Sequence, residues 1–164
     1  ERLQTDIRAS AESVIELNER AMAVIENKLA ETYHGQEKYD EAEPRYRSAV
    51  ATFLRLGRAD YAGPSLMKLG SLLIMRPAQA GQDKERDYEN AEGFLLDAVE
   101  IFRKAGPAER ARQREALLLL QTLYSPQHWD DPESLSRIDA ALQALDAATP
   151  STDAAPSAER PKEW

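Results

Sequence analysis

The chain has 164 residues, 42% of them hydrophobic and 30% charged, which is enough to bury one core. Its 29 acidic and 21 basic residues give a formal net charge of −8, which disfavours nucleic acid and anionic lipid as partners. The absence of cysteine excludes disulfides, thiolate metal sites and a cysteine nucleophile. No segment is apolar over the length of a membrane span, so we expect a soluble chain without direct membrane insertion. Because the chain begins with Glu1, removal of a leader or anchor stays open and the compartment, cytoplasmic or extracytoplasmic, is unknown.

The first predicted element is a long N-terminal helix with one apolar face. Apolar residues recur three and four positions apart, and no proline or glycine precedes Gly35. These residues, which we call the N-terminal stripe, are Leu3, Ile7, Ala11, Val14, Ala21, Ile25 and Leu29. The helix covers residues 1–22 and is either separate from the next helix or continuous with it, with about 30 residues in total. We interpret it as an extra helix packed on the first repeat; the alternative is that Arg2–Asn18 projects as a coiled coil or connector.

Two segments in the middle of the chain repeat each other. Tyr39–Asp60 aligns without a gap on Tyr88–Glu109, at an offset of 49 residues and with eight identities. The shared residues include two alanines seven positions apart, which let another helix approach closely. They also include a glycine near the end, Gly57 or Gly106, which suits a helix C-terminal cap. Both segments are therefore predicted to be helices that end at their glycines.

Each repeated helix follows another apolar helix. The two preceding helices carry Leu29-Ala30 and Leu69-Gly70 at equivalent places, at an offset of 40 residues. The difference between the two offsets puts nine additional residues between the helices of the second unit. We assign them to a polar loop at 77–86, which contains proline and glycine.

A third, divergent helix pair is predicted after Gly106. Its first helix covers Ala108–Tyr124, and its second begins at Asp131, where Asp131-Pro132-Glu133 is typical of a helix N-terminus. Residues 149–164 contain three prolines and many small or polar residues. We therefore predict a flexible tail there.

This repeat resembles a known family. The first unit is similar to the tetratricopeptide repeat, a helix-turn-helix of about 34 residues, at Leu29-Ala30, Tyr33, Tyr39, Ala42, Tyr46 and Ala49. The second unit repeats the pattern at Leu66, Leu69-Gly70, Leu73, Ala91, Leu95 and Ala98. The resemblance implies an all-α fold of about six or seven helices, in which antiparallel hairpins stack as a short right-handed solenoid. The implied repeat domain spans 23–148, with units at 23–57, 60–106 and 107–148.

The residues that usually carry catalysis or bind metals are nearly absent. His34 follows Glu31 by three residues, as in di-iron helical bundles, but the second Glu-x-x-His that such a site requires does not occur. No nucleophile elbow, phosphate-binding glycine loop or zinc motif is present. The four arginines between residues 45 and 58 lie among acidic residues, and we interpret them as a mixed solvated face rather than a phosphate site. We predict a protein that is not an enzyme and that binds no metal or cofactor.

The resemblance implies that the first helix of each hairpin lines a concave groove. The groove positions of the family correspond here to Asn27, Glu31 and His34 in the first unit and to Met67, Ser71 and Ile74 in the second. Members that bind a C-terminal carboxylate have lysine and asparagine in the slots occupied here by Asn27 and Glu31. Glu31 is expected to repel such a ligand.

The sequence therefore favours a non-catalytic scaffold or adaptor that binds a peptide or helix of another protein. The acidic net charge favours a neutral or basic ligand. Met67 is the expected apolar anchor, and Asn27 and Glu31 are expected to orient the ligand. The alternative is a structural or assembly domain of a larger or membrane-anchored complex, which self-associates through the N-terminal helix as a homo-oligomer.

Overall fold

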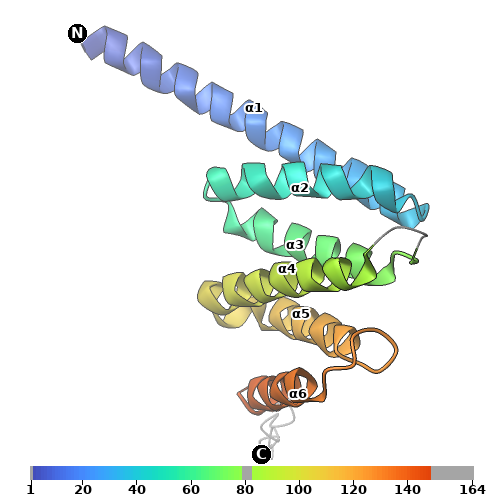
Figure 1. Ribbon diagram of the computed structural model, residues 1–164. Helices are drawn as coiled ribbons and strands as arrows, with labels where there is room; N and C mark the ends of the chain where they lie inside the picture. Colours follow the sequence, from blue (N-terminus) through green and yellow to red (C-terminus); the bar gives the residue numbers. More distant parts are fainter. Residues whose placement is uncertain (1, 79–82, 149–164) are drawn as a thin grey trace, which may run out of the picture.

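The computed structural model describes residues 2–78 and 83–148, and these residues form helices and connections without a strand (Figure 1). The six α-helices are α1 (Arg2–Gly35), α2 (Tyr39–Arg55), α3 (Ala59–Met75), α4 (Lys84–Ala105), α5 (Arg110–Leu123) and α6 (Pro132–Ala147). A short 3₁₀-helix, η1 (Pro107–Glu109), precedes α5. The prediction of an all-α fold with about six or seven helices is confirmed. The predicted tail at 149–164 lies outside the described residues.

Consecutive helices lie side by side and follow one another down the molecule (Figure 1). The connections alternate between two opposite ends, so neighbouring helices are antiparallel. Each helix packs on the next one along the chain, and α3 also contacts α5. The three predicted helix pairs thus have their counterparts in α1–α2, α3–α4 and α5–α6.

The two repeated helices end at the glycines that the alignment identified. α2 ends at Arg55 and is followed by Gly57 with φ of +65°, while α4 ends at Ala105 and is followed by Gly106 with φ of +93°. Glycine adopts positive φ angles without the steric cost that a Cβ atom brings. The predicted helix ends are confirmed.

The core is centred on α3, in which ten of 17 residues are buried. Two glycines bring α3 very close to α4. A Cβ atom at Gly70 would lie 2.7 Å from Leu95 Cγ, and one at Gly63 would lie 2.9 Å from Phe102 Cε1. Leu95 and Phe102 are buried and, like the two glycines, seven residues apart. The absent side chains of Gly63 and Gly70 therefore make room for the large side chains of α4.

The N-terminal segment forms one continuous helix of 34 residues, and its first half projects from the molecule (Figure 1). Residues 2–18 are exposed throughout, and burial begins at Glu19, which accepts a hydrogen bond of 3.1 Å from Arg55. The interpretation as an extra helix packed on the first repeat is therefore wrong, and Arg2–Asn18 projects. The reason is length, because α2 has 17 residues and can cover only half of α1.

The connection in the second unit is shorter than the predicted loop, because α4 begins at Lys84. Residues 79–82 of this connection lie outside the described residues. Lys84 Nζ donates to the carbonyl oxygens of Leu73 and Arg76, both at 2.6 Å, and of Ile74 at 3.1 Å. Leu73 and Ile74 lie in the last turn of α3 and Arg76 directly follows it, where carbonyls have no partner within the helix. Lys84 thus attaches the start of α4 to the end of α3.

A buried ion cluster joins three helices at the same end. Arg76 is 8% exposed and donates two hydrogen bonds to Asp87 of α4, at 3.0 and 2.5 Å. It also donates to Glu43 of α2 at 2.7 Å. Because these charges are shielded from water, each depends on its partners for compensation. The cluster ties the first hairpin to the second.

Replacing Gly70 by alanine tests the close packing of α3 on α4. The new methyl group meets Leu95, so Gly70→Ala should lower the free energy of unfolding by about 1–3 kcal/mol, although alanine is the better helix former. Gly93 of α4 provides the control, because nothing lies within 4 Å of its Cβ position. Gly93→Ala should raise the free energy by about 0.5–1 kcal/mol. Urea unfolding followed by circular dichroism measures both, and equal effects would contradict the packing.

Replacing Arg76 tests the ion cluster. Arg76→Met leaves Asp87 buried without its main partner and should cost about 3 kcal/mol of unfolding free energy. Arg103→Met is the control, because it breaks a pair with Glu100 that lies in solvent, and it should change the stability little. The same urea titration applies, and a small effect of Arg76→Met would show that the cluster is dispensable.

Candidate functional site

The six predicted groove residues lie on the first helices of two neighbouring hairpins. Asn27, Glu31 and His34 lie on α1, and Met67, Ser71 and Ile74 lie on α3. The three residues of α1 are partly exposed, as is Ser71. Met67 and Ile74 are 8% and 5% exposed and belong to the main core. The structure therefore brings four of the six to one surface.

The expectation that Met67 offers an apolar anchor at the surface is wrong. α3 packs against α2, α4 and α5, which leaves a narrow strip of the helix open to solvent. That strip carries Lys68 and Met75, each one position after an expected groove residue, and Met75 is 59% exposed. One residue corresponds to a rotation of about 100° around the helix axis. The repeat alignment thus located the helix and the exposed Ser71 correctly, but it placed the buried Met67 and Ile74 on the exposed face.

A polar network joins α1 to α3 on this surface. Ser65 Oγ donates to Asn27 Oδ1 at 2.7 Å, and Asn27 Nδ2 donates to Glu31 Oε1 at 2.9 Å. Lys68 Nζ donates to the same carboxylate oxygen, and Lys28 Nζ donates to Glu31 Oε2 at 2.9 Å. We call Asn27, Glu31, Ser65 and Lys68 the α1–α3 network. It holds the first helices of two hairpins together.

Glu31 is ionised within this network, and its charge is balanced. Partial burial acts to raise the pKa of Glu31, but hydrogen bonds from Lys68 and Lys28 and their charges outweigh it, so the pKa lies below its ordinary value. The expectation that Glu31 repels a carboxylate took no account of Lys68. A ligand at this position meets an acceptor and a cationic donor side by side.

An open pocket of about 440 Å³ adjoins the network. We call it the α1–α3 pocket, and its lining residues are Glu31, His34, Gly35, Glu37, Tyr39, Tyr46, Lys68 and Met75. The His34 ring lies 5.9 Å from the Tyr39 ring and 6.2 Å from the Tyr46 ring, between centroids. The pocket therefore combines an aromatic and apolar part with a charged part.

His34 is neutral at pH 7 in this setting. Partial burial lowers its pKa below the ordinary value, and the nearby charge of Lys68 lowers it further. A neutral imidazole offers one ring nitrogen as donor and the other as acceptor. His34 can thus form a hydrogen bond with a ligand of either kind.

Sequence reasoning missed Lys68 and Met75. A signal for Lys68 was present, because it is the one charged residue between Asp60 and Arg76 in an otherwise apolar helix. A single charge in such a helix marks the side that reaches solvent. Met75 carried no comparable signal, since an apolar residue at a helix end fits a buried or an exposed position.

The structure gives no free cationic stripe and no metal-binding group in the residues that it describes. The four arginines between residues 45 and 58 each form an ion pair with a carboxylate: Arg45 with Glu26, Arg47 with Glu43, Arg55 with Glu19 and Arg58 with Asp60. Paired in this way, they do not form a free cationic stripe. Among residues 2–78 and 83–148, no group of three or more histidines and carboxylates is arranged to hold a metal ion.

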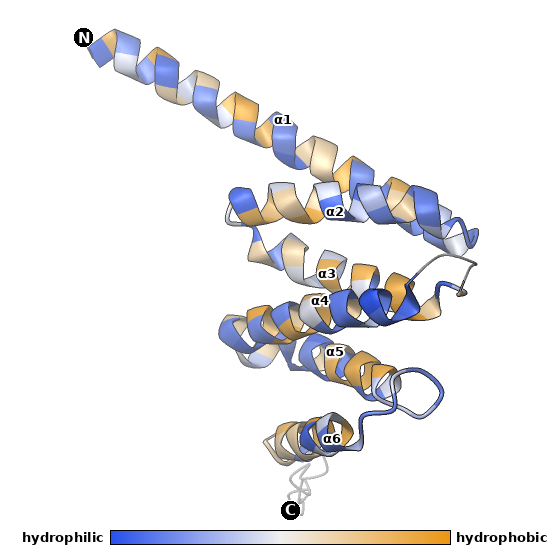
Figure 2. Cartoon of the chain, viewed as in Figure 1, coloured by the Kyte–Doolittle hydropathy of each residue, from blue (hydrophilic) through white to orange (hydrophobic). Residues whose placement is uncertain are grey.

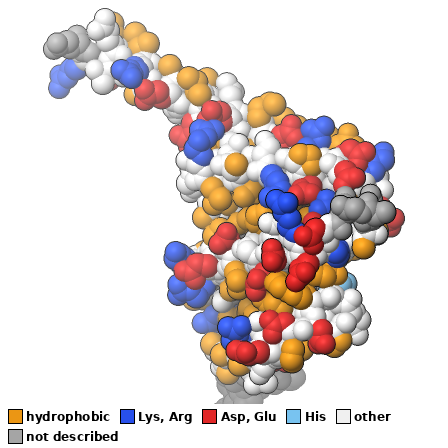
Figure 3. Space-filling view, viewed as in Figure 1, with side chains coloured by type: hydrophobic (Ala, Val, Ile, Leu, Met, Phe, Trp, Pro, Cys, Tyr) orange, Lys and Arg blue, Asp and Glu red, His pale blue; other side chains and the backbone are white. Residues whose placement is uncertain are grey.

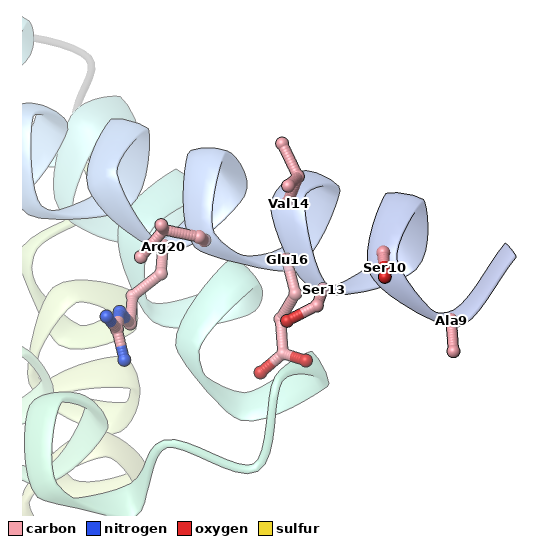
Figure 4. A pocket seen from close by; sticks show the side chains of 7 residues that line it. Ala9, Ser10, Ser13, Val14, Glu16 and Arg20 are labelled. Atoms are coloured by element: carbon pink, nitrogen blue, oxygen red, sulfur yellow. The ribbon is translucent and has the colours of Figure 1, made fainter. Parts of the chain in front are cut away.

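A hollow of about 630 Å³ runs along the projecting half of α1 (Figure 4). Its lining residues are Ala9, Ser10, Ser13, Val14, Glu16, Leu17 and Arg20. All of them belong to α1, and no second element closes the hollow. It is the surface of a projecting helix rather than a cavity that could enclose a ligand.

Comparison with protein-family models, with curated proteins and with solved structures found no match to this chain. The resemblance to the tetratricopeptide repeat therefore stays a prediction that rests on the repeat within the chain. None of the helices in the described residues combines the length and apolar character that crossing a membrane requires.

The pKa of His34 provides a direct test of the site's electrostatics. We expect its NMR titration midpoint to lie below 6.5, and Lys68→Met should move it upward because a neighbouring cation is removed. His128 provides a second imidazole signal in the same spectra.

The lowered pKa of His34 also makes the stability of the fold depend on pH. Since the unfolded chain binds a proton more readily, the contribution of His34 to the free energy of unfolding is complete above pH 6.5 and is lost as the pH falls toward the folded pKa. A midpoint above 6.5 would contradict the burial of this ring.

Proposed function

We propose that this chain is a non-catalytic protein-interaction module, built of tetratricopeptide-like hairpins, that binds a peptide or helix of a partner protein at the α1–α3 pocket. The observation that carries the proposal is the position of exposed Met75 beside two aromatic side chains and the paired charges of Glu31 and Lys68. An apolar contact surrounded by a few oriented polar groups is typical of sites that recognise peptides.

The pocket suits a segment that passes across the surface. Its volume of about 440 Å³ accommodates one or two side chains, and its open form leaves room for the ligand backbone to continue on both sides. Met75 adapts its shape to different apolar side chains because it is unbranched and polarisable. The polar groups of Glu31, Lys68 and His34 then select the orientation of the bound chain.

The charges around the pocket support a neutral or basic ligand. Glu31 is paired with Lys68 and Lys28, and Glu37 contributes a further negative charge to the lining. The net charge of −8 for the whole chain acts in the same direction over longer distances. An acidic peptide is disfavoured on both counts.

The experiment selects ligands from a random peptide library displayed on phage, with the purified protein as bait, and measures the affinity of an enriched synthetic peptide. We expect enriched sequences with apolar and basic residues. Met75→Asp should weaken binding by at least about tenfold, because it removes the apolar contact of the pocket. Salt should weaken the binding of basic peptides in particular.

Leu96→Asp is the matched control, because Leu96 is an exposed apolar residue of α4 outside the pocket. It should leave the affinity unchanged, and circular dichroism should show that both variants keep their helices. Glu31→Lys combined with Lys68→Glu keeps an ion pair but reverses its direction, and it should change the preferred peptides. Failure to enrich any peptide, or equal binding by the Met75 and Leu96 variants, would refute the proposal.

A further inference from the structure

The N-terminal stripe is exposed along its whole length. Its large side chains, Leu3, Ile7, Val14, Ile25 and Leu29, are between 40% and 74% exposed. Hydrophobic residues alternate with hydrophilic ones along all of α1 (Figure 2), and apolar side chains appear on the surface of its projecting half (Figure 3). A long apolar row of this kind, interrupted only at Asn18, marks a surface that packs against another helix.

The stripe lies on the side of α1 that faces away from α2. Ala23 and Ala30 are buried toward α2, and the rotation of about 100° per residue places Ile25 and Leu29 on the opposite side. The projecting half continues this division, since Val14 points away from the side on which Glu16 and Arg20 lie (Figure 4). The two halves of α1 therefore share one apolar face that nothing in the described residues covers.

The stripe has the same order of residues in both directions. Leucine stands at each end (Leu3 and Leu29), isoleucine follows on the inside (Ile7 and Ile25), and alanine comes next (Ala11 and Ala21), while Val14 near the middle has Asn18 as its counterpart. Each of these pairs is centred on residue 16. An antiparallel copy of the helix, crossing at residue 16, therefore brings leucine against leucine, isoleucine against isoleucine and alanine against alanine.

We infer that the N-terminal stripe binds a second copy of this chain, with the two α1 helices antiparallel and crossing at the level of residue 16. Such an interface uses the same surface on both copies, as two-fold symmetry requires. The projecting half of each copy then covers Ile25 and Leu29 of the other. The opposed alanines, five residues from the crossing point on either side, leave room there for the two helices.

Two further apolar side chains flank the crossing point. Leu17 and Ile15, both more than half exposed, lie on either side of it.

A parallel pair is the alternative order, because it also brings each stripe residue against its own counterpart, and the cross-linking below distinguishes the two orders. A membrane surface favours lysine and arginine on the polar face, but residues 2–18 contain two basic and three acidic side chains.

The inference does not rest on the proposed peptide site, since Glu31 and His34 lie on a different side of α1 from the stripe. Its first test is the mass of the purified protein by sedimentation velocity over a range of concentrations, with no ligand present. We expect a monomer–dimer equilibrium, and Ile7→Glu or Ile25→Glu should raise the dimer dissociation constant by at least about tenfold. Leu54→Glu is the control, because Leu54 and Ile25 are both 51% exposed and Leu54 lies on α2.

The second test determines the order of the two helices by cysteine cross-linking, for which a chain without native cysteine is well suited. An antiparallel pair predicts that Ile7→Cys and Ile25→Cys proteins, mixed and oxidised, form a mixed disulfide, whereas Ile7→Cys alone forms little dimer. Preferential cross-linking of Ile7→Cys to itself would indicate a parallel pair and overturn the inference. A monomer at every concentration, including one that binds anionic lipid vesicles, or a dimer insensitive to both glutamate variants, would overturn it as well.

Discussion

The close approach of α3 and α4 is the constraint on which the rest of the molecule depends. Gly63 and Gly70 leave no room for a side chain, and Phe102 and Leu95 occupy the space. With α3 held in this way, α2, α4 and α5 surround it and most of its residues are buried. The first hairpin (α1–α2) and the third (α5–α6) therefore pack on the second hairpin, and both of them contact α3.

The position of α3 also determines which of its side chains reach the surface and contact other helices. Since three helices cover it, Lys68 and Met75 are among the few α3 side chains that reach solvent. Lys68 binds Glu31 of α1, while Arg76 at the end of the helix binds Glu43 and Asp87. The same helix thus supplies the core, the polar links between hairpins and one side of the candidate site.

α1 distributes its apolar residues in an unusual way for a terminal helix. It turns small alanines, Ala23 and Ala30, toward α2 and leaves large side chains such as Ile25 and Leu29 exposed. Small residues allow α2 to pack closely, while large ones provide the greater gain when they are removed from water. Such a distribution suits a helix that has partners on both of its sides.

The amino-acid sequence by itself determined the local features of this protein. Apolar periodicity predicted the helices, and the aligned Gly57 and Gly106 predicted where two of them end, because both depend on short-range backbone geometry. The sequence did not decide whether Met67 or Lys68 faces solvent, since that depends on how three neighbouring helices cover α3. Nor did it decide that the first half of α1 projects, because an apolar stripe is equally compatible with a helix packed on its own chain. Burial is set by the relative positions of whole helices, and only the tertiary structure supplies these positions.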